Sequence, residues 1–132
     1  MRIRCLGFVL LVLFGCGRAP VPVPVQGTVT LDGKPLAEGK IFFIFAGKVP
    51  ESLDVKDGRY AGKVLPGARR VEIAAYRLKE IPADIPKSMH ALIEPGRENY
   101  LPDRYHRDSD LTANVTAAGE NDFTFTLVSR AE

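Results

Sequence analysis

Apolar and polar residues alternate along several stretches of the chain between residues 25 and 127. Successive side chains of a β-strand point to opposite faces, so this alternation predicts strands that bury one face and expose the other. The stretches that carry the pattern are 25–31, 59–64, 69–77, 111–115 and 123–127. Their expected inward positions are Val25, Gly27, Val29, Leu31, Tyr60, Gly62, Val64, Val71, Ile73, Ala75, Leu111, Ala113, Val115, Phe123, Phe125 and Leu127.

A further stretch, 40–46 (KIFFIFA), is apolar on both faces and predicts a central strand. Turn residues separate the strands: Asp32-Gly33 favours a tight turn, and Leu65-Pro66-Gly67 fits a type II turn. Leu53 and Val55 indicate a short additional strand. No amphipathic helix of useful length is predicted, and six to seven short strands separated by turns favour an all-β antiparallel sandwich.

Residues 78–110 break this pattern, because they hold four of the ten prolines and no sustained periodicity. For residues 88–93 the sequence leaves a short strand and a helical turn equally open. A connection of this length is unusual in a compact domain and often carries function. We therefore expect residues 78–110 to form a long loop that contributes little to the core and forms the interaction surface.

The N-terminus is typical of an export signal, with Arg2 and Arg4 ahead of an apolar run that is too short to cross a bilayer. The run ends in Leu13-Phe14-Gly15-Cys16, which resembles a bacterial lipobox. This resemblance implies a lipoprotein signal peptide over residues 1–15 and lipidation of Cys16. Residues 16–24 then form a Pro/Val tether, with the domain at 25–130. In such lipoproteins an aspartate directly after the lipidated cysteine favours retention at the inner membrane. Position 17 is Gly, so an outer-membrane or cell-surface location is favoured.

Charge and cysteine content exclude several classes of protein. Loss of Arg2 and Arg4 with the signal leaves 16 basic and 16 acidic residues, so the mature chain has no electrostatic footprint for nucleic acid. Cys5 also lies in the signal, and Cys16 alone can form neither an intramolecular disulfide nor a cysteine-ligated zinc site.

Three segments resemble a known group of domains. They are VQGTVTLDGKPL at 25–36, DGRY at 57–60 followed by LPG at 65–67, and YLPDRY at 100–105 leading to LTA at 111–113. These segments are similar to the carboxypeptidase regulatory-like, transthyretin-type domains of bacterial lipoproteins. The resemblance implies a single seven-stranded Greek-key sandwich (transthyretin or prealbumin type) without an assigned catalytic activity.

Candidate site residues gather near the end of the 78–110 loop. Tyr100, Tyr105 and His106 are candidates for contact with a ligand or partner. Carboxylates ligate calcium, so a calcium site is an alternative to a solvated charge cluster for three aspartates of the same region. These aspartates are Asp103, Asp108 and Asp110.

The sequence contains no nucleophile–base motif or phosphate-binding glycine loop, and it predicts neither catalytic residues nor a cofactor. We therefore expect a non-enzymatic, lipid-anchored protein of the cell-envelope surface that interacts with an envelope protein or a glycan. The alternative is a module that binds a carbohydrate or small ligand through the 78–110 loop. A hydrolase or metal-dependent enzyme is the third possibility.

Overall fold

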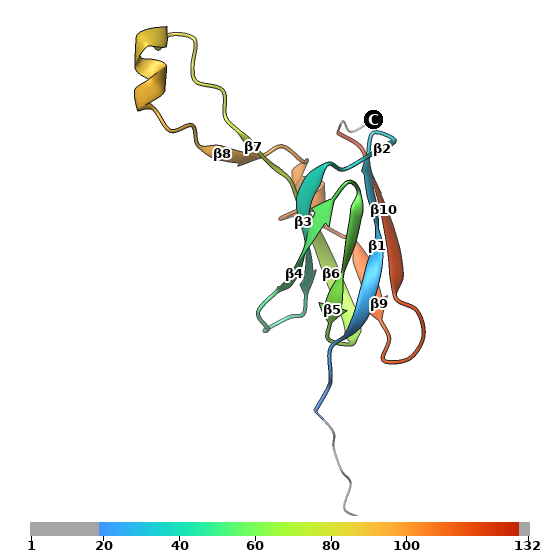
Figure 1. Ribbon diagram of the computed structural model, residues 1–132. Helices are drawn as coiled ribbons and strands as arrows, with labels where there is room; N and C mark the ends of the chain where they lie inside the picture. Colours follow the sequence, from blue (N-terminus) through green and yellow to red (C-terminus); the bar gives the residue numbers. More distant parts are fainter. Residues whose placement is uncertain (1–18, 130–132) are drawn as a thin grey trace, which may run out of the picture.

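The computed structural model describes residues 19–129, and these form an all-β fold (Figure 1). One sheet contains eight strands, in the order β10-β1-β5-β4-β3-β6-β9 with β2 beside β1. Its strands are β1 (Val23–Leu31), β2 (Lys34–Pro35), β3 (Glu38–Ile44), β4 (Glu51–Lys56), β5 (Arg59–Val64), β6 (Gly67–Ala74), β9 (Thr112–Val115) and β10 (Asp122–Leu127). A second sheet pairs β7 (Tyr76–Leu78) with β8 (Arg97–Asn99).

The all-β prediction is confirmed, and differences in detail lie at the strand ends. β1 begins at Val23, within the residues expected to form the tether, because Val23 pairs with Val64 of β5. The single strand expected over 69–77 is divided at Ala75 into β6 and β7. At Ala75 the backbone N–H donates to Oδ1 of Asn99 (3.1 Å), and the carbonyl accepts from the N–H of Tyr100 (3.0 Å). The chain therefore leaves the large sheet at this residue.

The pairing of β1 with β10 corrects the expectation of an entirely antiparallel fold. These strands run parallel, from Gln26 opposite Asp122 to Leu31 opposite Leu127. The reason is that β9 and β10 do not form a hairpin: residues 116–121 carry the chain from one end of the strand order to the other. Six residues span at most about 20 Å, so the two ends of the sheet must approach each other. The sheet is therefore curled.

One hydrophobic core fills the inside of the curled sheet. β4 and β5 pair only at Lys56 and Arg59, so the sheet opens between them and both halves contribute to the same core. The ring of Phe43 from β3 meets the ring of Tyr60 from β5, with centroids 6.2 Å apart. The most deeply buried large side chains are Phe43, Leu36, Ile41, Ile73, Leu127, Val29, Val55, Val64, Val71 and Val115.

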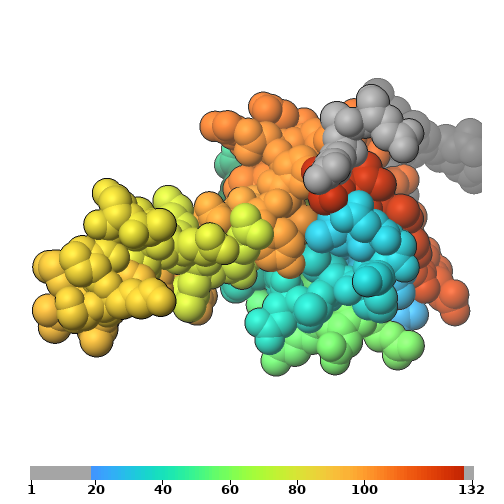
Figure 2. Space-filling view, turned by 90° about the horizontal axis from the view of Figure 1, so that it is seen from above, coloured from blue at the N-terminus to red at the C-terminus, as the bar shows by residue number. Residues whose placement is uncertain are grey.

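The segment 78–110 consists of two parts with different environments. Its N-terminal part, with β7 and β8, forms an arm (residues 76–99) that stands clear of the large sheet (Figures 1 and 2). The arm ends in the 3₁₀ helix η1 (Lys87–Leu92), which resolves the alternative that the sequence left open there. The C-terminal part returns to the core through Leu101 and Tyr105, the latter in the 3₁₀ helix η2 (Asp103–Tyr105). The expectation that this whole segment contributes little to the core was therefore wrong.

Candidate functional site

Tyr105 is placed in the core, although its sequence position suggested a contact residue. Its side chain is 8% exposed, and its hydroxyl oxygen accepts a 2.9 Å hydrogen bond from the N–H of Val128. The Arg104 guanidinium covers the ring at 4.8 Å from its centroid. Tyr105 thus ties η2 to the end of β10, which leaves it little surface for a ligand.

Tyr100 and His106 are half-buried and take part in separate contacts. The guanidinium of Arg77 lies 5.7 Å from the centroid of the Tyr100 ring. His106 packs beside Phe42, and its Nδ1 lies 3.7 Å from a carboxylate oxygen of Glu72. The structure therefore does not arrange the three candidate contact residues as one exposed surface.

The aspartates considered for calcium do not form a metal site. Asp103 is paired with Arg107 at 2.5 Å, and both side chains are exposed. Among residues 19–129 no three His, Cys, Asp or Glu side chains gather in a way that could hold a metal ion. Asp103 therefore belongs to a solvated ion pair, and the calcium alternative gains no support for Asp108 or Asp110.

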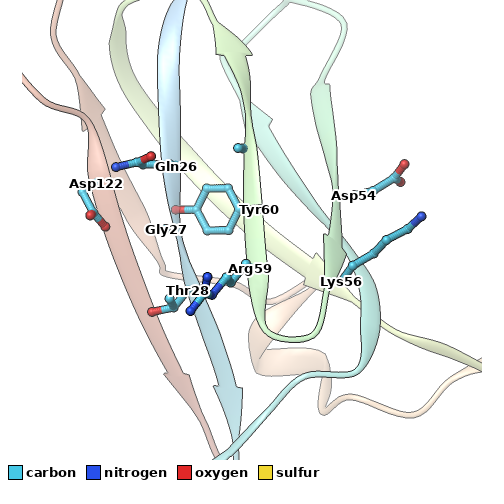
Figure 3. Close-up of a pocket in the computed structure, with 9 residues that line it drawn as sticks. Gln26, Gly27, Thr28, Asp54, Lys56, Arg59, Tyr60 and Asp122 are labelled. Atoms are coloured by element: carbon cyan, nitrogen blue, oxygen red, sulfur yellow. The ribbon is translucent and has the colours of Figure 1, made fainter.

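A first hollow of about 430 Å³ lies on the large sheet, and Figure 3 shows the side chains around it. At its centre the Tyr60 hydroxyl donates a 2.7 Å hydrogen bond to the carbonyl oxygen of Phe123. Burial raises the pKa of Tyr60 well above its ordinary value, so this phenol is neutral and its proton is committed to the backbone. The first hollow thus offers polar contacts, while the hydroxyl of Tyr60 is taken up by the backbone. Its lining residues are Gln26, Gly27, Thr28, Asp54, Lys56, Arg59, Tyr60, Ala61 and Asp122.

A second hollow of about 280 Å³ lies where the arm leaves the large sheet, and we call it the root hollow. Tyr76 and Arg97 line it from the arm, while β3 and β4 supply the opposite residues. The Tyr76 side chain is 50% exposed. The residues from β3 and β4 are Glu38, Gly39, Lys40, Asp54, Val55 and Lys56.

The two hollows are neighbours, because Asp54 and Lys56 line both. In Figure 3, Asp54 and Lys56 lie on one side of the Tyr60 ring, and Gln26 and Asp122 lie on the other. The alternating pattern of the sequence predicts Tyr76 to point outward, and this is confirmed. What the sequence could not reveal is that Tyr76 lines a hollow together with residues from β3 and β4, because those strands lie 20 or more residues away along the chain.

The arm also exposes apolar side chains. Leu92 is 82% exposed, and Leu78 and Met89 are exposed as well. None of the six residues of η1 is buried. Single exposed apolar residues are common on protein surfaces, but a projecting arm that shows several of them is typical of a contact surface.

Comparison of the chain with protein-family models, curated proteins and solved structures gives no match. Within residues 19–129, no helix has the length and apolar character needed to cross a bilayer. The lipidation candidate Cys16 and the expected signal peptide 1–15 lie outside the described residues. Function must therefore be inferred from the arm and the two hollows.

Proposed function

We propose that this chain is a lipid-anchored, non-enzymatic module of the cell-envelope surface, which binds a partner protein through the tip of its arm. The observation that carries the proposal is the 82% exposure of Leu92 at the end of a projecting arm. Burial of a side chain such as Leu or Met stabilises a complex by about 1.5–3 kcal/mol relative to exposure. An isolated two-stranded ribbon is marginally stable, so a partner would also order the arm.

The charge of the arm supports a protein partner over a polyanion. Residues 76–99 hold four basic and four acidic side chains, so the arm has no net charge when His90 is neutral. A neutral surface gains little from a nucleic acid or an anionic membrane, whereas an apolar groove on a protein would take up Met89 and Leu92. The basic residues are Arg77, Lys79, Lys87 and Arg97, and the acidic ones are Glu80, Asp84, Glu94 and Glu98.

The position of the arm relative to β1 supports an anchored arrangement. β1 enters the large sheet at one end, and the arm leaves from the opposite end (Figure 1). A lipid on Cys16 with a short Pro/Val tether would hold the start of β1 near the membrane. The arm would then point away from that membrane, toward partners in the envelope space or outside the cell.

The transthyretin-type Greek-key sandwich is the finer fold assignment that accompanies this proposal. Two observations support it. β4 and β5 pair at a single residue pair, Lys56 with Arg59, and the two parts of the sheet on either side of this point share one core. The parallel pairing of β1 with β10 is a feature that a purely antiparallel description omits.

Two experiments test the proposal. Cys16→Ser should release the chain from the membrane fraction, and a variant that stays with membranes contradicts the anchor.

For the arm, a photoreactive group at Ala91 should cross-link one partner on intact cells, while the same group at exposed Thr124 should not. Met89→Ser with Leu92→Ser should remove that cross-link. A cross-link that survives both serines, or that also forms from Thr124, contradicts docking by the arm tip.

The alternative function, binding of a carbohydrate or small ligand, is favoured by the exposed Tyr76 side chain in the root hollow.

A further inference from the structure

We infer that the root hollow binds an acidic sugar residue of a glycan, with Tyr76 as the stacking surface and Arg97 as the partner of the sugar carboxylate. This inference goes beyond docking of the arm tip and does not require it. The root hollow and η1 lie at opposite ends of the arm, so ligands could occupy the two places independently (Figure 1).

The pairing of β7 with β8 holds Tyr76 and Arg97 on the same side of the arm. Tyr76 pairs with Asn99, and Arg97 lies two residues before Asn99, so the two side chains share a face of the ribbon. Diagonal neighbours of this kind are about 7–8 Å apart, which places the ring and the guanidinium beside one another. Tyrosine has an apolar ring face and a polar hydroxyl tip, the combination that suits the CH face and hydroxyl groups of a sugar.

The charges around the root hollow favour an anionic ligand. Three basic side chains, Lys40, Lys56 and Arg97, face two acidic ones, Glu38 and Asp54. Lys40 and Asp54 form an ion pair at 3.5 Å, and both side chains are exposed. Breaking this ion pair so that Lys40 can contact a ligand therefore costs little free energy.

Arg97 is the cation best placed to bind a carboxylate. Its neighbour on β8, Glu98, is paired with Arg77 at 2.9 Å and does not neutralise it. Within the described part of the chain, Arg97 has no ion-pair partner of its own. A guanidinium binds a carboxylate through two parallel hydrogen bonds, which gives both affinity and orientation.

The size of the hollows indicates a glycan chain in place of a free monosaccharide. The root hollow, at about 280 Å³, is at the lower limit of small-molecule sites, which begin at about 300 Å³, and so suits a single sugar residue. The first hollow begins on the far side of Asp54 and Lys56 and offers the amide of Gln26, the hydroxyl of Thr28 and the guanidinium of Arg59. These groups can hydrogen-bond the hydroxyls of adjoining sugar residues.

The test is calorimetric titration of the Cys16→Ser chain with tetragalacturonate, and with the neutral galactose tetramer of matched length. We expect the acidic tetramer to bind and the neutral one to bind about tenfold more weakly. Tyr76→Ala and Arg97→Ala should each weaken binding of the acidic tetramer about tenfold, while Tyr76→Phe retains most of it. Both residues are exposed, so far-UV circular dichroism should show an unchanged fold.

A matched control separates this inference from the proposed function. Met89→Ser with Leu92→Ser should leave glycan binding unchanged, because neither residue lines the root hollow. Equal binding of the acidic and neutral tetramers, or unchanged affinity in Tyr76→Ala, overturns the inference. Absence of binding by the parent chain overturns it as well, and none of these results affects cross-linking through the arm tip.

Discussion

The hydroxyl of Tyr60 on β5 donates a hydrogen bond to the carbonyl oxygen of Phe123 on β10, across the strand that lies between them. That strand is β1, and its residue in register with both partners is Gly27. A Cβ atom at Gly27 would lie 1.9 Å from the Phe123 oxygen and 2.5 Å from the Tyr60 hydroxyl. Because Gly27 has no side chain, the Tyr60 side chain can reach across β1 and connect β5 to β10.

Gly27→Ala should lower the free energy of unfolding by about 3 kcal/mol, because a methyl group there forces apart a backbone carbonyl and a buried ring. Urea denaturation followed by circular dichroism measures the change. The control is Gly96→Ala on the arm, where the nearest atom is 3.8 Å from the added Cβ. This control should change stability by less than about 0.5 kcal/mol, and equal losses in the two variants would contradict the steric argument.

Because Tyr60 is buried, we also expect the folded chain to lose stability in alkaline solution. Burial raises its pKa in the folded chain above the ordinary value of 10.0, so folding favours the protonated phenol. The resulting stabilisation is complete below pH 10 and is lost as the pH rises from 10 toward the folded-state pKa. We expect Tyr60→Phe to lose about 1 kcal/mol at pH 7 with the hydrogen bond, and to lose less further stability than the parent chain between pH 9 and pH 11.

Urea denaturation of both chains across this pH range measures the effect. The difference between them removes the contribution of the other tyrosines and lysines, which titrate in both proteins. Parallel curves for the two chains would mean that Tyr60 does not carry the alkaline sensitivity.

Arg69 is a basic side chain at an inward position, where it is only 6% exposed. Its guanidinium donates to the carbonyl oxygen of Leu65 (2.8 Å from Nη2), lies 3.7 Å from Glu51 and covers the ring of Phe45. Arg69→Met should cost about 2 kcal/mol, because the turn carbonyl and the carboxylate lose their buried partner. A thermal or urea unfolding series measures this change.

The matched control is Arg77→Met, which removes the exposed ion pair with Glu98 and should cost less than about 1 kcal/mol. A smaller loss for Arg69→Met than for Arg77→Met would show that the contacts of Arg69 with the turn do not stabilise the fold.

The sequence pattern was sufficient to predict the strands and the all-β class, because alternation reports directly which face of a strand is buried. Val29, Val64 and Val71 are buried where that pattern placed them. Partner choice was not predictable, because residues 122–127 alternate identically whether they pair in parallel or antiparallel fashion. Arg69 shares the inward face of Val71 and Ile73, and a charge at an apolar position was the available signal of a buried contact.

The division of the 78–110 segment into an exposed arm and a buried part was harder to predict, because prolines interrupt the periodicity of the sequence in both parts. Leu101 and Tyr105 stand four positions apart, but no sustained apolar pattern surrounds this single pair, and yet both residues are buried in the core. The root hollow could not be predicted either. It brings Lys40 and Asp54 close to Tyr76 and Arg97, and this proximity depends on tertiary contacts.

Replacing residues 79–96 with a short Gly/Ser linker should leave the free energy of unfolding within about 1 kcal/mol of the parent value, because this segment buries no side chain in the core. The linker keeps β7 and β8, and hence the contacts of Ala75 with Asn99 and Tyr100. Tyr105→Ala should instead cost about 3–5 kcal/mol, because it empties a buried site of an aromatic side chain. Urea denaturation of the three proteins under one set of conditions measures both effects.

Tyr105→Phe distinguishes packing from hydrogen bonding at the same position. It keeps the ring in the core but removes the oxygen that accepts from Val128, and should cost about 1 kcal/mol. If the linker variant unfolds while Tyr105→Ala remains stable, the assignment of the arm to the surface and of η2 to the core is reversed. If the linker variant keeps the parent stability while Tyr105→Ala loses it, the arm is dispensable for folding, as the exposure of Leu92 at its tip indicates.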